Sequence, residues 1–130
     1  MPTLLNPLRR TLGTVYADGA YDTRSCHQLI KHKGATACIP PRKNAGLWEK
    51  EHPRNEVVLV MRKEGLPHWK NVSGYHRRSL AETAMYRFKQ LMAGQISLRN
   101  YNGQVGEIMA YVCAINKLNA LGLPVRKPQV

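Results

Sequence analysis

Acidic residues are scarce in this chain. Its 130 residues contain eight Asp and Glu against 20 Lys and Arg, which gives a formal net charge of +12 at pH 7. A positive excess of this size indicates a polyanionic partner, most simply nucleic acid, although a ribosome-like or merely basic protein has the same balance. The hydrophobic content of 43% excludes a disordered basic tail and fits one compact domain with a moderate core.

Cysteine is also rare, and long apolar runs are absent. Cys26, Cys38 and Cys113 are odd in number and far apart, so we expect reduced core thiols of an intracellular protein. The five histidines form no recognisable metal-binding set. No apolar run approaches the roughly 18 residues that span a bilayer, and residues 1–10 are too short and proline-interrupted for a signal peptide. We therefore expect no membrane association and a cytoplasmic, nucleoid-associated location.

The first half of the chain has the pattern of a βαβ unit. After an irregular lead, residues 14–17 are rich in β-formers, residues 24–33 have helical apolar spacing that ends at Gly34, and residues 35–39 form a second β-rich run before two prolines. This order predicts a parallel strand pair joined by a right-handed crossover.

Two acidic residues follow the first predicted strand. Asp18, just past the strand end, is a candidate metal ligand or a plain turn residue. Asp22 has a more ordinary explanation, because either it or Thr23 is placed to cap the next helix. Arg42 and Lys43 follow the second strand at the same edge, where they are expected either to hold a phosphate backbone or to be solvated.

The segment from 44 to 73 is ambiguous. Residues 57–61 are β-branched like a strand, yet Pro53 suits the first position of a helix, so a helix over 54–64 that is broken by Gly65 and Pro67 is favoured. Trp48 and Trp69 either stack on unpaired bases or anchor the core.

A helix beginning at Tyr75 and ending near residues 93–94 is the most informative element. On a wheel turning about 100° per residue, one narrow face that points away from the core carries four residues, which are Tyr75, Arg78, Glu82 and Lys89. The opposite face is apolar and is the expected core face, with Leu80, Ala84, Phe88 and Leu91. The ordinary interpretation of the charged face is a solvated surface with an Arg78–Glu82 pair.

The remaining chain is predicted to be a loop at 100–103, a helix over 104–121 that is buried on most sides, and a basic tail. Gly122 and Pro124 are expected to end that helix. Between Lys70 and Arg99 the chain has six Lys or Arg and one acid, Glu82.

The spacing Tyr75-x2-Arg78-x3-Glu82-x6-Lys89 resembles the YREK signature of the DDE transposases of bacterial insertion sequences. Residues 17–22, 39–45 and 73–79 also resemble segments of that family, in the family's order. The resemblance implies part of an RNase H-like α/β fold, in which Asp18 is the second and Glu82 the third acid of a metal-binding triad. It also implies Mg²⁺ or Mn²⁺ as cofactor and transposon-end DNA as partner. The residues expected to support the site and bind DNA are Tyr75, Arg77, Arg78, Lys89, Arg42 and Lys43.

One departure from the family pattern affects the expected activity. The family's first acid precedes Asp18, but residues 1–17 contain no Asp or Glu. We therefore expect the C-terminal part of a transposase catalytic domain over 14–124, with the sheet's first strands missing, an N-terminal lead at 1–13 and a basic tail at 125–130. Such a fragment binds DNA and is inactive alone, unless another chain or a second copy supplies the missing half. The alternatives are a non-enzymatic nucleic-acid-binding protein and a remnant that folds poorly.

Overall fold

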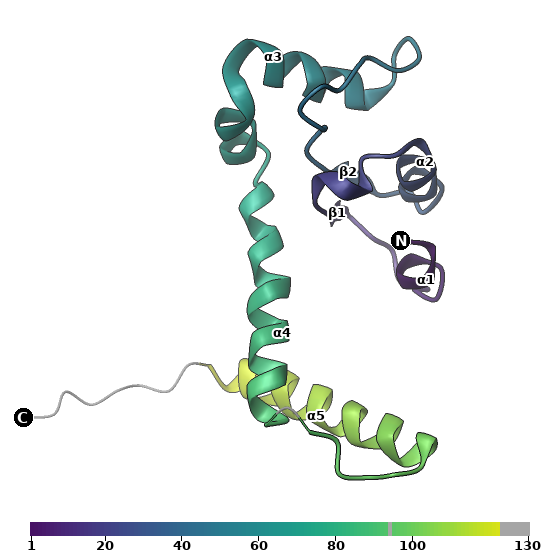
Figure 1. The fold of residues 1–130 in the computed structure, drawn as a ribbon, viewed down its shortest axis with the longest axis vertical. Coiled ribbons are helices and arrows are strands. Elements are labelled where there is room, and N and C mark those ends of the chain that lie inside the picture. The colour runs from purple at the N-terminus through teal and green to yellow at the C-terminus, as the bar shows by residue number, and fades with distance from the viewer. Residues whose placement is uncertain (94, 123–130) are drawn as a thin grey trace, which may run out of the picture. The chain divides into compact units, whose positions relative to one another are not determined.

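The structure is a computed structural model that describes residues 1–93 and 95–122. The chain falls into two compact units, one of Met1–Arg78 and one that begins at Ser79. The first unit contains the sheet and the second is helical, so the described chain is mixed α/β with mostly helices (Figure 1).

The sheet has two parallel strands, as predicted. β1 (Thr14–Tyr16) pairs with β2 (Thr36–Cys38), with Thr14 opposite Thr36 and Tyr16 opposite Cys38. The connection between them is α2 (Arg24–His32). A crossover helix is required because parallel strands cannot be joined by a tight hairpin.

Local sequence sets both ends of α2. The Thr23 hydroxyl accepts a hydrogen bond from the Cys26 amide at 3.3 Å, so Thr23 rather than Asp22 is the cap. The helix stops before Gly34, whose φ of +69° lies in the left-handed region that favours glycine. Ile30 is only 1% exposed and anchors α2 in the core.

Helices cover the two strands on both faces. Val15 and Ala37 belong to a cluster with Leu5 and Ile30, whereas their neighbours Tyr16 and Cys38 belong to another with Trp69 and Tyr75. Alternate residues of a strand point to opposite faces, so the first cluster lies on the side of α2 and the second on the side of α3. Leu5 comes from α1 (Pro2–Leu5), a short helix within the lead that the sequence predicts to be irregular.

The ambiguous segment is a helix, as favoured, and the strand alternative is wrong. α3 (Pro53–Val72) begins with Pro53 after an N-cap at His52 and is kinked at Gly65, whose φ of 85° is not helical. Trp69, in the part beyond the kink, is 6% exposed. It anchors the core, in agreement with the more ordinary of its two interpretations.

The long helix expected from Tyr75 is divided. Residues Tyr75–Arg78 form the 3₁₀ segment η2, and α4 (Ser79–Leu91) follows. A 3₁₀ turn has about three residues per turn, so a wheel drawn at 100° per residue misplaces its side chains. Tyr75 is 8% exposed in the core, so it does not lie on an outward face as the wheel predicted.

In the second unit, α4 packs against α5 (Tyr101–Leu121). Asn100 caps α5 by accepting the Gly103 amide at 2.6 Å, so residues 101–103, predicted to be a loop, are its first turn. The positive φ of Gly122 ends α5 as expected, while Pro124 and the tail lie outside the described residues.

The burial predicted for both helices is wrong. α4 has no buried residue, Leu80 is 69% exposed, and Ile115 is the buried residue of α5. Each helix packs on the other along one stripe, which leaves its remaining apolar side chains exposed. Cys113 is likewise exposed and not a core thiol, whereas Cys38 is buried and Cys26 half-buried.

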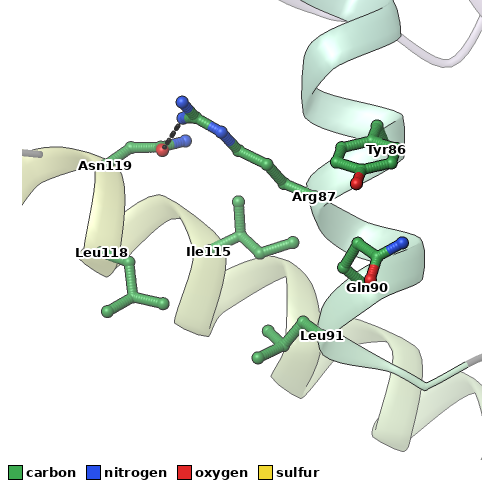
Figure 2. A pocket seen from close by; sticks show the side chains of 7 residues that line it. All are labelled: Tyr86, Arg87, Gln90, Leu91, Ile115, Leu118 and Asn119. Carbon is green, nitrogen blue, oxygen red and sulfur yellow. Dashed lines mark hydrogen bonds between the residues drawn. The ribbon is translucent and has the colours of Figure 1, made fainter.

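The stripe between α4 and α5 borders an open cavity of about 300 Å³ whose accessible surface is mostly apolar (Figure 2). Arg87 donates a hydrogen bond across it to the Asn119 side chain at 2.9 Å. Leu91 and Ile115 supply apolar contact in the same cavity. These contacts define how the two helices of the second unit pack.

Candidate functional site

The carboxyl ends of β1 and β2 lie at one edge of the sheet. Ala17 follows β1 and still pairs with β2, because its amide donates a hydrogen bond to the Cys38 carbonyl at 3.4 Å. Asp18 follows Ala17 and is exposed. Its Oδ1 accepts the Ala20 amide at 3.0 Å, which caps the 3₁₀ turn η1 (Gly19–Tyr21). The turn predicted at this position is confirmed, and it presents a carboxylate to solvent at the strand end.

The turn after β1 packs closely on the loop after β2. A Cβ at Gly19 would lie 3.3 Å from the Pro40 carbonyl oxygen, so the approach leaves little room for a side chain. The Arg42 guanidinium donates to the carbonyls of Gly19 and Ala20, each at 3.4 Å. The structure therefore brings Arg42 beside the turn that carries Asp18. Lys43, the next residue, is exposed.

Asp22, at the end of the same turn, is buried. Its side chain is 1% exposed, and its two oxygens accept hydrogen bonds from Arg54 Nε and Nη2 at 2.5 and 2.6 Å. His27 Nε2 lies 3.1 Å from Oδ1, and the Arg42 amide donates to Oδ2 at 3.3 Å. This carboxylate thus joins the turn after β1, the loop after β2, α2 and α3.

These hydrogen-bond donors keep the Asp22 carboxyl group ionised. Burial alone would raise the pKa of Asp22, but the hydrogen bonds and charge of Arg54, helped by Arg42 and His27, lower that pKa below its usual value. Burial also lowers the pKa of His27, more than the neighbouring Asp22 raises it. At neutral pH the site therefore contains an ionised Asp22 and a neutral His27.

Trp48 covers this pair from the loop side. The Arg54 guanidinium carbon lies 4.0 Å from the centre of the Trp48 ring, and the rings of His27 and His52 meet it edge-on at 5.1 and 4.9 Å. A flat guanidinium on an indole face is a favourable cation–π contact. Trp48 therefore contributes to the structure of the first unit through these stacking contacts.

The polar face of α3 also fixes the loop after β2. Arg54 Nη1 donates to the Gly46 carbonyl at 2.9 Å, and Arg62 donates to the Ala45 carbonyl at 2.9 Å. Asn55 accepts the Trp48 amide at 2.8 Å and donates to the Glu49 carbonyl at 2.8 Å. The loop that carries Arg42 and Lys43 is thus tied to α3 at several points.

The residues of the predicted signature fall in both units. Tyr75 is buried against Trp69, with ring centres 5.6 Å apart, and the Arg78 guanidinium lies 5.7 Å from the Tyr75 ring. Arg77 is exposed beside them.

In α4, Glu82 and Lys89 are exposed and seven residues apart, which places them on one face two turns apart. Asp18 belongs to the first unit and Glu82 to the second.

Sequence reasoning missed Arg54 and assigned Asp22 only a capping role. The two residues are 32 positions apart, and neither belongs to a motif with recognisable spacing. The only local sign was an acid placed where Thr23 already supplied the cap. Long-range pairing of this kind becomes visible only when the chain has folded.

The described residues contain no group of three or more His, Cys, Asp or Glu side chains that could hold a metal ion. The carboxylate of Asp18 has the hard oxygen donors that Mg²⁺ prefers, so it fits as one ligand of such an ion.

Across residues 1–93 and 95–122, no helix is long and apolar enough to cross a bilayer.

The chain is basic, and at one sheet edge the exposed Asp18 begins a turn that Arg42, from the loop after β2, contacts. A family model described as a transposase DDE domain matches residues 1–117. The chain therefore belongs to the DDE transposase family, which associates it with DNA transposition and with the divalent metal ions that such enzymes generally use. The match includes residues 1–13, which the sequence-based boundaries had set apart. No solved structure matches the chain.

Proposed function

We propose that this chain binds transposon-end DNA as part of a transposase catalytic domain of the YREK type. The observation that carries the proposal is the exposed Asp18 at the end of β1, with Arg42 from the end of β2 against the same turn. A carboxylate beside a guanidinium provides one metal ligand and one phosphate-binding group at a single edge.

The roles of the remaining residues follow the spacing of the signature. Glu82 is proposed as the other acid of this chain that binds metal, and Lys89 lies on the same face of α4 to bind phosphate. Tyr75 supports the site from the core and holds Arg78 against its ring, while Arg77 and Lys43 contribute positive charge. When bound, Mg²⁺ would activate a nucleophilic oxygen and stabilise the leaving oxygen of the phosphodiester.

The proposed architecture is the C-terminal part of an RNase H-like fold, spanning 14–124. Two parallel strands covered by α2 on one face and α3 on the other support this proposal. Asp18 and Glu82 are proposed as two ligands, and residues 1–17 contain no Asp or Glu that could be the family's first acid.

The test is metal-dependent DNA cleavage and strand transfer after mixing the chain with a transposase segment that carries the family's first Asp. We expect activity with Mg²⁺ that is lost in Asp18→Asn and in Glu82→Gln. The matched control is Glu49→Gln, which removes an exposed acid that pairs with Arg24. Cleavage that continues unchanged in Glu82→Gln would contradict the assignment.

A second candidate function is sequence-independent nucleic-acid binding without catalysis. The excess of six Lys or Arg over one acid between Lys70 and Arg99 favours it. In that case DNA affinity is the same with Mg²⁺ and with EDTA, and Asp18→Asn does not alter it.

A further inference from the structure

Asp22 joins four segments of the first unit through one buried carboxylate. Its partners are Arg54 from α3, His27 from α2 and the amide of Arg42 from the loop after β2, while Asp22 itself ends the turn that begins at Asp18. Only the three residues of η1 separate the buried acid from the exposed one. A displacement of Asp22 therefore moves the backbone that carries Asp18.

We propose that Asp22 and Arg54 are positioning residues that hold Asp18 and Arg42 in register for metal and phosphate binding. This inference rests on the proposed function, in which Asp18 is a metal ligand. Arg54 acts through Asp22 and the η1 turn, and it does not itself contact the metal or the DNA.

The geometry leaves Arg54 little freedom to follow a moving turn. Two of its nitrogens bind the two oxygens of Asp22, the third binds the Gly46 carbonyl, and Trp48 covers its face. A planar fork held at all three nitrogens fixes both the distance and the orientation of its partner carboxylate.

Further contacts within the turn and the loop transmit this constraint to Asp18. The Arg42 side chain holds the carbonyls of Gly19 and Ala20, and its amide binds the second oxygen of Asp22. Gly19 lies so close to the Pro40 carbonyl that the turn has little room to move toward the loop. The Ala20 amide in turn holds Oδ1 of Asp18.

Arg54→Lys separates a positioning role from a purely structural one. Lysine keeps the positive charge beside Asp22 but cannot bind both oxygens and Gly46 at once. The matched control is Arg62→Gln, which removes another hydrogen bond from α3 to the same loop, at Ala45, without touching the turn of Asp18.

The experiment is a titration with Mn²⁺ of the full 130-residue chain mixed with the unlabelled transposase segment that carries the family's first Asp. Binding is monitored by paramagnetic broadening of the backbone amide NMR signals of the 130-residue chain. In the unmodified chain we expect joint broadening of the amides of Gly19, Ala20 and Arg42, and its loss in Asp18→Asn. In folded Arg54→Lys, the same broadening should require roughly tenfold more Mn²⁺, as is typical when a group that orients a metal ligand is changed. The Arg42 signal should no longer broaden together with the turn.

The outcomes separate the two hypotheses. Unchanged broadening in Arg54→Lys, together with its loss in Asp18→Asn, overturns the positioning role and leaves the proposed metal ligand intact. Broadening that is absent from the unmodified chain, or that persists in Asp18→Asn, overturns the proposed function itself. An equal weakening in Arg62→Gln shows general loosening of the loop and also counts against a specific role for Arg54.

A measurement on the unmodified chain keeps the inference testable should Arg54→Lys fail to fold. Coupling between sites is reciprocal, so binding of Mg²⁺ at Asp18 should also perturb Arg54. We expect the Arg54 Nε–H and Ala20 amide signals to shift with the same midpoint on Mg²⁺ titration. A shift of Ala20 with no change at Arg54 overturns the positioning role.

Discussion

Arg54 binds both oxygens of the Asp22 carboxylate, and the side chains of the two residues are 4% and 1% exposed. A buried ion pair is costly to form, because both charges lose their hydration, and it is retained when hydrogen bonds satisfy every donor and acceptor. Here Arg42, His27 and Gly46 complete that set. The pair therefore holds the strand ends, α2 and α3 of the first unit together.

Removal of one partner should destabilise the first unit strongly. Arg54→Ala leaves the Asp22 charge buried without its main partner, and we expect a loss of about 3–5 kcal/mol in the free energy of unfolding, measured in urea. The control is Arg24→Ala, which breaks an ion pair with Glu49 whose side chains are both 62% exposed. That control should cost no more than about 1 kcal/mol, and an equal loss in both variants would contradict the prediction.

The first unit should lose stability on acidification in two stages. The folded-state pKa values of His27 and His52 are lowered, chiefly by burial, so below about pH 6.5 the unfolded chain binds protons that the folded chain does not. The free energy of unfolding then falls as the pH drops. A second fall begins below about pH 3.8, because the folded-state pKa of Asp22 is also lowered.

Urea unfolding measured from neutral to acidic pH tests this dependence. His27→Gln cannot titrate but still offers an N–H donor to Asp22, so the fall in stability below about pH 6.5 should be smaller in this variant. The stage below pH 3.8 should remain in this variant. If the fall in the free energy of unfolding below about pH 6.5 is unchanged in His27→Gln, groups other than His27 cause it.

In the second unit, Ile115 should contribute most to the contact between α4 and α5. It is 9% exposed and lines the cavity shared with Leu91, so Ile115→Ala should lower stability by about 2–4 kcal/mol. Leu118→Ala removes a residue that is 55% exposed in the same cavity and should cost much less. Thermal unfolding followed by circular dichroism compares the two variants.

DNA binding should depend steeply on salt, because each Lys or Arg at a phosphate releases a counterion. Removing one such contact by Lys89→Ala should reduce the slope of log K against log salt by about 0.9. Arg78→Ala should act similarly, whereas Lys63→Ala, on the exposed side of α3, serves as the control. Filter binding at several salt concentrations measures the slopes, and equal slopes in all three variants would contradict the assignment.

Local sequence correctly predicted the elements whose signals are local. Thr23 and Gly34 define α2, short runs of β-forming residues give β1 and β2, and Pro53 with Gly65 marks the start and the kink of α3. The parallel pairing of the strands was predicted from the order of the elements and the length of their connection. The division at Tyr75 was missed, because a 3₁₀ segment and an α-helix share the same apolar spacing over four residues.

The sequence by itself determined the positive charge, the strand–helix–strand unit, the exposed acid at residue 18 and the resemblance to transposases, since each depends on composition or on short spacings. Only the tertiary structure revealed the pairing of Asp22 with Arg54, the burial of Tyr75 and the exposure of α4 and α5. Burial and ion pairing depend on which distant segments meet, and a one-dimensional pattern does not contain that information.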